Sequence, residues 1–292
     1  MPVRSRWNRP LGFLLAALTA IMTIVLSGCY LVPPKLPDDL STPPPAVPRK
    51  RTITIATAAD RPPMMFKDKT SGEIVGADRE LMTALAAEWK TELRVIEAPR
   101  DQLLDLVASG KVDLAMGGVL DTVEDQRKVT FVDYFKPGVR IYTTAGRLQD
   151  FGSKTSLCGR TVAVASDLDD QQVGVFSEEN CAHLGRPVIR RVRANSAKSA
   201  RQLLDRGRVD LVAHNAESYA YLTMTYPGQY SGVLDPLPTG RYAVAVKISD
   251  TELARAVVAG FVSLRAGDAY DDILRRWYLS YGRARPEING VR

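Results

Sequence analysis

The chain has 292 residues, of which 45% are hydrophobic and 25% are charged, so it is long and apolar enough for one large or two moderate globular domains. This composition excludes a disordered or a fibrous protein. The formal net charge of +6 falls to +3 once residues 1–28, which hold three Arg and no acidic residue, are set apart. So mild a charge gives no support to nucleic-acid binding.

The N-terminal residues follow the pattern of a secretory signal. Basic residues precede an apolar run from Leu11 to Leu26, and the run ends in the letters LSGC, of which the last is Cys29. This ending resembles the lipobox of bacterial lipoproteins, in which the cysteine is acylated and becomes the mature N-terminus. The other interpretation is a transmembrane anchor, for which a run of about sixteen residues is short. We therefore expect a lipoprotein signal peptide over 1–28 and a lipid anchor at Cys29.

A proline-rich segment follows the signal. Residues 29–50 carry seven Pro and show almost no periodicity. Such a composition favours an extended, semi-rigid chain without a core of its own. We expect this segment to be a tether that holds the folded body away from a membrane.

The cysteine count is consistent with an oxidising compartment. If Cys29 carries the lipid, Cys158 and Cys181 remain as an even pair, for which a disulfide is the natural interpretation. Two independent buried thiols are the alternative. The two His, at 183 and 214, have no metal-ligand spacing, so we expect neither a metal nor a cofactor.

Strand and helix patterns alternate from residue 51 onward, which is typical of a mostly parallel sheet with helices on its faces. Leu81, Leu85 and Trp89 recur at helical spacing, and a turn at Asp60–Pro63 ends the first strand. The predicted elements are a strand at 51–60, a helix at 76–90, a strand at 92–98, a helix that ends at Gly110 and a strand from 112 to 116.

The same pattern begins again at residue 161, with strands at 161–165, 187–192 and 208–214 and a helix at 196–207. The letters RGRVDLVAHN of the last strand repeat much of SGKVDLAMGG in the first part. We interpret Gly110 and Gly207 as residues that end helices with positive φ, each followed by Val-Asp-Leu entering a sheet. The spacing before the two glycines differs, so we infer two lobes of one architecture and not a strict duplication.

Residues 239–282 add one strand, YAVAVK, and two helices. A lone strand cannot form a sheet, so we expect it to return to the first lobe. Chain crossings near Tyr142–Gly146 and near Thr239–Tyr242 would then form a hinge, with a ligand cleft between the lobes. The expected organisation is lobe 1 at 51–144 plus 241–278, lobe 2 at 145–240 and a C-terminal tail at 279–292.

Several segments of the body, in this order and spacing, are similar to the family 3 extracellular solute-binding proteins, the receptor subunits of polar amino-acid ABC importers. They include ADRPPMMFKDKTSGEIVGADRELMTALA, LLDLVASGKVDLAMGG, DTVEDQRKVTFVDYFKPG, LCGRTVAVASD, GRVDLVAHNAESYAYL, RYAVAVKISDTEL and AYDDILRRW. The resemblance covers nearly all of residues 52–278. It implies a two-lobed α/β fold of the type II periplasmic-binding-protein class with two hinge crossovers.

The resemblance also marks candidate ligand contacts in the first lobe, and most of the side chains there differ from the family pattern. Family members typically bind the ligand α-carboxylate through an Arg, whose position is Asp125 here. The hydroxyl position of the preceding turn is Leu120, while Gly118 keeps the close backbone approach. The aromatic residues that usually enclose the ligand correspond to Met64 and Arg100.

The second lobe differs in the same way. The Gly-Thr-Thr turn that donates to the ligand carboxylate corresponds to Asp167-Leu168-Asp169, and the acid that receives the α-ammonium corresponds to Asn215. Asp60, next to the first strand, completes the candidate ligand-binding set.

These differences predict a changed ligand preference. A carboxylate beside Asp125, Asp167 and Asp169 would lose its Arg partner and meet like charges, each at a cost of a few kcal/mol in a closed cleft. We therefore predict that the cleft does not bind an ordinary α-amino acid in the family's manner. The acidic rim, with Arg61 and Arg100 opposite, suits a cationic or dipolar solute or a peptide fragment; the alternatives are an empty pocket and a one-residue slip that hides the true Arg.

The expected function is that of a monomeric, lipid-anchored receptor at the extracytoplasmic face of a bacterial membrane, with a small polar solute and an ABC permease as partners. A non-transporting sensor or partner-docking lipoprotein on the same fold is the alternative. Cyclohexadienyl dehydratases resemble this family, and murein lyases carry such a domain. This chain holds no lysozyme-like domain, and we expect no enzymatic activity.

Overall fold

A computed structural model of the chain describes residues 51–292. The expected signal peptide at 1–28, the lipid site at Cys29 and the tether at 29–50 lie outside the described residues. None of the helices that the structure describes is long and apolar enough to cross a membrane.

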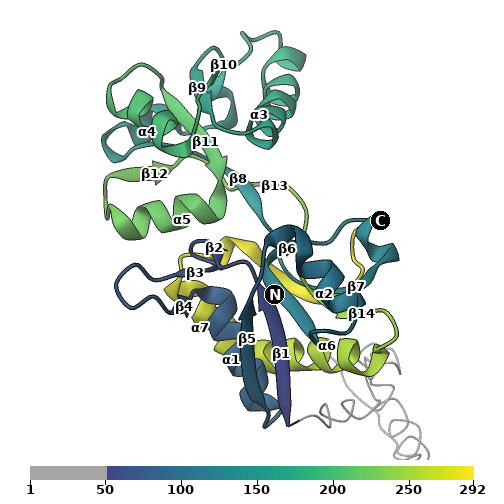
Figure 1. The fold of residues 1–292 in the computed structure, drawn as a ribbon. Coiled ribbons are helices and arrows are strands. Elements are labelled where there is room, and N and C mark those ends of the chain that lie inside the picture. The colour runs from purple at the N-terminus through teal and green to yellow at the C-terminus, as the bar shows by residue number, and fades with distance from the viewer. Residues whose placement is uncertain (1–50) are drawn as a thin grey trace, which may run out of the picture. The chain divides into compact units, whose positions relative to one another are not determined.

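The first lobe is built on a six-stranded mixed sheet (Figure 1). β1 pairs in parallel with β5 and β6, and β14 pairs antiparallel with β6 and β7. The strands, in sheet order, are β15 (Arg283–Ile288), β7 (Val129–Phe135), β14 (Tyr242–Lys247), β6 (Leu114–Leu120), β1 (Thr52–Thr57) and β5 (Glu92–Glu97). A small antiparallel sheet adjoins it, formed by β2 (Asp60–Arg61), β3 (Met65–Lys67) and β4 (Ile74–Val75).

Helices cover both faces of the first sheet, because its strands present apolar side chains to both faces. On one face Ile53 and Ile55 pack in a cluster with residues of α1 (Ala77–Glu88), α6 (Thr251–Ala266) and α7 (Ala269–Arg276). On the other face Ala56 packs with residues of α2 (Leu103–Ala108).

The second lobe has a sheet and helices of its own (Figure 1). The strands are β10 (Arg190–Arg193), β9 (Thr161–Val164), β11 (Leu211–Asn215), β8 (Gly138–Thr144) and β12 (Tyr230–Gly232), with β13 (Leu237–Pro238) also on β8. Residues of α3 (Asp167–Asn180) pack in one cluster, and residues of α4 (Ala197–Asp205) and α5 (Ala216–Thr225) pack in another.

The repeated Val-Asp-Leu segments occupy matching places in the two lobes. Gly110 and Gly207 have φ of 74° and 66°, as the sequence predicts for residues that end helices. The next Asp carboxylate then accepts a hydrogen bond from the neighbouring parallel strand, which is β1 or β9: Thr54 N donates to Asp113 at 2.9 Å, and Thr161 N donates to Asp210 at 2.9 Å. Each Asp thus ties a helix-to-strand turn to the neighbouring strand.

Two connections join the lobes, and the first lies earlier than predicted. β8 pairs with β11 and β12, so residues 138–144 belong to the second sheet, and the crossing is at Lys136–Pro137 and not near Tyr142–Gly146. Proline has no N–H to donate to a ladder, which explains the break between β7 and β8. The second connection, Thr239–Arg241, lies beside the first, since Thr239 N donates to Pro137 O at 3.2 Å.

The C-terminal part of the chain completes the first lobe. β14, the YAVAVK strand, returns to the first sheet as predicted. β15, which lies in the segment expected to be a tail at 279–292, is also part of that sheet, paired antiparallel with β7. The sequence pattern RARPEI, with four charged or proline residues, gave no strand signal of its own, and its pairing at a sheet edge is set by tertiary contacts.

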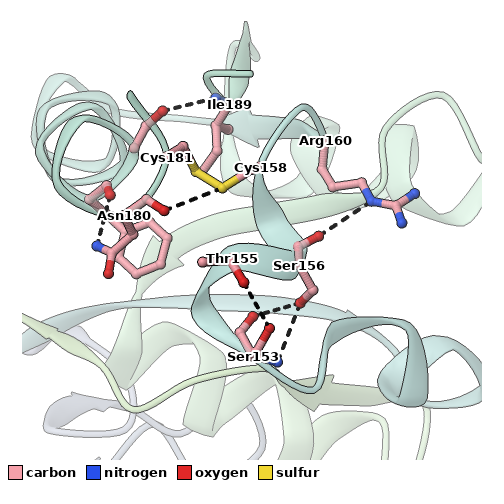
Figure 2. The surroundings of a disulfide bond; sticks show 10 residues. Ser153, Thr155, Ser156, Cys158, Arg160, Asn180, Cys181 and Ile189 are labelled. Atoms are coloured by element: carbon pink, nitrogen blue, oxygen red, sulfur yellow. Dashed lines mark hydrogen bonds between the residues drawn. A yellow bond between two sulfur atoms is a disulfide. The ribbon is translucent and has the colours of Figure 1, made fainter. Parts of the chain in front are cut away.

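The second lobe contains the predicted disulfide. Cys158, just before β9, bonds to Cys181, just after α3, with Cα atoms 5.5 Å apart (Figure 2). The Cys181 side chain is buried in the same cluster as Val173 and Phe176 of α3. The bond therefore fixes the C-terminal end of α3 to the segment that enters β9.

Candidate functional site

A cavity of about 370 Å³ lies where residues of the two lobes face each other. This volume lies within the range of small-molecule sites, and the cavity is lined at the carboxyl ends of β6, β9 and β11, where ligands of open α/β sheets bind. The lining residues are Asp60, Arg61, Pro62, Met64, Leu120, Pro137, Ser166, Leu168, Asp169, His214, Asn215, Glu217, Ser218, Thr239 and Tyr242.

Arg61 supplies a guanidinium to the first-lobe wall of the cavity. Its Nη1 donates to the Tyr242 hydroxyl at 3.2 Å, and its Cζ lies 5.9 Å from the Tyr242 ring centroid. The side chain passes so close to Gly118 that a Cβ there would lie 3.0 Å from Arg61 Cδ. Gly118, with φ of 66°, thus leaves room for the arginine.

The Asp60 carboxylate on the same wall already has a partner. It forms a two-point ion pair with Arg100, whose Nη1 also donates to Gly117 O at 3.0 Å and Gly118 O at 3.3 Å. Arg100 therefore holds Asp60 and the backbone of Gly117 and Gly118 in place. Arg100 itself is not among the residues that line the cavity.

Asp78 supports the same turn from the first residues of α1. Its Oδ2 accepts a hydrogen bond of 3.1 Å from Gly118 N, and the side chain is fully buried. Burial raises the pKa of Asp78 to about 7, against the opposing effects of the Tyr134 hydroxyl and the Gly118 N–H.

The second-lobe wall is made by the first turns of α3 and α5. Ser166 caps α3 by accepting from Asp169 N at 3.1 Å, and the buried Asp169 carboxylate lies 3.1 Å from His214 Nδ1. Asn215 caps α5 in the same way, since its Oδ1 accepts from Ser218 N at 3.0 Å. Asp169 and Asn215 are thus engaged within their own lobe.

Glu217 is the unusual residue of this wall. Its side chain is 2% exposed, and neither carboxylate oxygen has a hydrogen-bond partner with normal geometry. Burial raises the pKa of Glu217 to about 8, although its own backbone N–H, the Arg61 charge and the nearby Asn215 amide oppose the rise. A buried carboxyl without a partner is costly, so its position beside a cavity calls for a functional explanation.

Aromatic side chains also make contacts between the lobes. Phe66 of β3 lies edge-on to Tyr221 of α5, with ring centroids 5.3 Å apart, and also edge-on to Trp277 at 6.0 Å. Arg140 of β8 lies over the ring of Tyr281, at 5.7 Å from its centroid. Glu217 therefore belongs to a helix, α5, that also packs against the first lobe.

The structure brings together five of the residues that the sequence marks as ligand contacts. They are Asp60, Met64, Leu120, Asp169 and Asn215. Gly118 and Arg100 lie behind the wall. Asp125 and Asp167 are not part of the cavity lining. Asp125 accepts a hydrogen bond of 2.8 Å from Thr122, and the Asp167 side chain is 99% exposed beside Arg193.

Sequence reasoning did not single out Glu217, Tyr242 or His214. Glu217 had one usable signal, because it is an acidic residue in the first turn of the helix that follows a strand ending at the cleft. Tyr242 begins the strand that returns to the first lobe, and its position at the cavity depends on the pairing of β14 with β6.

Comparisons with known proteins agree with this architecture. Residues 53–280 match the sequence profile of a family described as bacterial extracellular solute-binding proteins, family 3. An arginine-binding protein, ArgT, of Corynebacterium glutamicum is 25% identical over 256 residues, which cover 86% of this chain and 82% of that protein. A histidine-binding periplasmic protein of Escherichia coli is 24% identical over 221 residues, 73% of this chain and 83% of that protein.

A solved structure shows the same fold. The second substrate-binding domain of Lactococcus lactis GlnP, in an open conformation, superposes with a TM-score of 0.71 and 22% identity. The match covers 80% of this chain and 97% of that domain, and it confirms the predicted two-lobed α/β fold.

Proposed function

The chain belongs to family 3 of the bacterial extracellular solute-binding proteins, and from this premise we propose that its cleft binds a small polar, amino-acid-like solute and delivers it to an ABC permease. Membership of this family makes the chain a solute-binding protein and not an enzyme.

The observation that carries the proposal is a cavity with a basic side chain on the wall of one lobe and acidic side chains on the wall of the other. Arg61 lies on the first-lobe wall, and Asp169 and Glu217 lie on the second. A dipolar solute can satisfy both walls at once, and closure of the lobes would then exclude water from its charges. The similarity to proteins named as arginine-binding and histidine-binding supports an amino acid as that solute.

The manner of binding differs from that of the family. Asp125 stands where the carboxylate-binding Arg is typical, and it lies outside the lining. Leu120 and Leu168 replace polar residues of the usual carboxylate site, and they are 40% and 42% exposed at the cavity. An apolar pair cannot donate hydrogen bonds, so the ligand carboxylate needs another partner.

The lipobox-like ending at Cys29 and the proline-rich tether support a receptor that is lipid-anchored at the outer face of the membrane, next to its permease. Growth with an alkyne analogue of palmitate should label the chain, and Cys29→Ser should abolish the label and release the protein from the membrane. A label that persists in Cys29→Ser contradicts the anchor.

Calorimetric titration of the purified chain, as processed by the cell, with the common L-amino acids tests the binding function. At least one amino acid should bind with a Kd in the micromolar range or below, as a receptor requires. Binding that is lost on Asp125→Ala would overturn the changed manner of binding, and no binding of any amino acid would overturn the proposed solute class.

A further inference from the structure

Arg61 and Glu217 are a basic and an acidic side chain on opposite walls of one cavity, and they do not pair with each other. Neither oxygen of Glu217 has a hydrogen-bond partner of normal geometry, and Arg61 donates to the Tyr242 hydroxyl. The two side chains still influence each other, because the Arg61 charge opposes the rise of the Glu217 pKa. They are thus near enough to interact and too far apart for a direct ion pair.

The other charged groups of the lining have partners within their own lobe. Asp60 pairs with Arg100, and Asp169 lies against His214 and also accepts from Ala165 N at 3.4 Å. A ligand would have to displace these contacts to use either carboxylate. Among the lining side chains, Arg61 and Glu217 therefore have the most unused hydrogen-bonding capacity.

The Arg61 guanidinium has donors to spare. It carries five N–H groups in a planar fork, and one of its nitrogens meets the Tyr242 hydroxyl. A fork of this kind matches a carboxylate, which it binds through two parallel hydrogen bonds. The close pass over Gly118 sets its place in the same turn region where family members bind the ligand carboxylate.

In its ionised form, the buried Glu217 carboxylate requires a cationic donor. It is nine-tenths or more buried, unpartnered and on the cavity lining, so a ligand ammonium would satisfy a group that the protein itself leaves unsatisfied. Asn215, at the position where the family has an ammonium-binding acid, is taken up by the α5 cap. Glu217 lies two residues further along the same helix start.

We propose that Arg61 and Glu217 form a relocated clamp for a dipolar solute, in which Arg61 binds the ligand carboxylate and Glu217 binds its ammonium group. This inference rests on the proposed function, since it names the side chains that hold the amino-acid-like solute. The clamp replaces the usual contacts at positions 125 and 215, and it connects one lobe to the other through the ligand.

The test uses the purified full chain and the common L-amino acid that it binds most tightly. Arg61→Gln and Glu217→Gln should each weaken binding by roughly 30-fold or more, the usual result of removing one partner of a buried charge pair. Arg127→Gln and Glu124→Gln are matched controls, because both residues are exposed and lie outside the cavity lining. They should bind as the wild type does.

The decarboxylated amine of the same ligand separates the two halves of the clamp. For arginine this is agmatine, and for histidine it is histamine. The amine should bind the wild type more weakly than the amino acid, and Arg61→Gln should not weaken it further, whereas Glu217→Gln should. Arg61→Lys keeps the charge without the fork and should lose less affinity than Arg61→Gln.

Thermal unfolding of each variant checks that it folds, and the amine comparison in the wild type needs no variant at all. Amino-acid binding that survives both Arg61→Gln and Glu217→Gln within threefold overturns the clamp and leaves the proposed function standing. Binding that is lost in Arg127→Gln also overturns the clamp. Arg127, two residues after Asp125, would then be the arginine that binds the ligand carboxylate. If the wild type binds none of the common L-amino acids, both proposals fail.

Discussion

The proposed clamp predicts that Glu217 couples ligand binding to pH. Burial raises its pKa to about 8, and the groups that face it are Arg61, Asp78, Asn215 and the phenols of Tyr242 and Tyr281. The free protein therefore holds a proton on Glu217 at pH 7. A bound ammonium favours the carboxylate and lowers this pKa, so the proton leaves when the ligand binds.

Ligand affinity should therefore rise between about pH 6 and 8 and level off above the pKa of Glu217. Calorimetry at pH 7 in two buffers of different ionisation enthalpy should show the release of up to about one proton per ligand. Glu217→Gln should abolish the release. A wild type that releases no proton would show that the ammonium binds elsewhere.

The sequence located the walls of the cavity better than the groups that face into it. Motif spacing pointed to Leu120 and Asn215, which both line the cavity, because each ends a strand and the backbone fixes such positions. It could not show that Asn215 is used as a helix cap or that the buried carboxyl is Glu217. Those facts depend on how α5 packs against the first lobe, which no local pattern encodes.

At the scale of elements, the strands and helices with strong periodicity were predictable. The Val-Asp-Leu segments of β6 and β11 were found from letters alone, since each follows a glycine that ends a helix. The division between β7 and β8 was misplaced, although Pro137 and Gly138 mark it in the sequence. Both sides of the break are rich in apolar residues, so hydrophobic pattern alone does not separate the strands of the two sheets.

α3 is held at one end by the disulfide and lines the cavity at the other. The bond closes a loop with a sequence separation of 23, so its loss should destabilise the second lobe by about 3 kcal/mol in the chain-entropy model. The double variant Cys158→Ser/Cys181→Ser should show this loss in urea unfolding. A reducing agent should produce the same loss in the wild type and none in the variant.

A different outcome would change the view of this element. If the double variant unfolds at the same urea concentration as the wild type, the packing of Val173 and Phe176 holds α3 without the bond.

At the scale of the molecule, the lobes are joined by paired connections and by α5. Thr239 N donates to Pro137 O, so the two connections run side by side. The aromatic contact of Phe66 with Tyr221 adds a second link between the lobes. Order along the chain was enough to predict two lobes, because a returning strand needs a sheet, whereas the contacts of α5 with the first lobe needed the structure.

Three buried carboxyl groups, spread over both lobes, give the whole body an unusual dependence of stability on pH. Burial raises the pKa of Asp78 and Asp133 to about 7 and that of Glu217 to about 8. Between their ordinary values near 4 and these raised values, the folded chain keeps protons that the unfolded chain has released. Stability therefore falls as pH rises through this window.

The melting temperature without ligand should accordingly be higher at pH 6 than at pH 8.5, with a difference in unfolding free energy on the order of a few kcal/mol. Asp133 lies in β7 outside the cavity, so Asp133→Asn isolates this effect from ligand binding. The neutral isostere cannot gain a charge as pH rises, and its melting temperature should fall less than that of the wild type. A wild type that becomes steadily more stable from pH 6 to 8.5 would mean that these carboxyl groups are ionised in the folded chain. That result would also contradict a protonated Glu217 in the free protein.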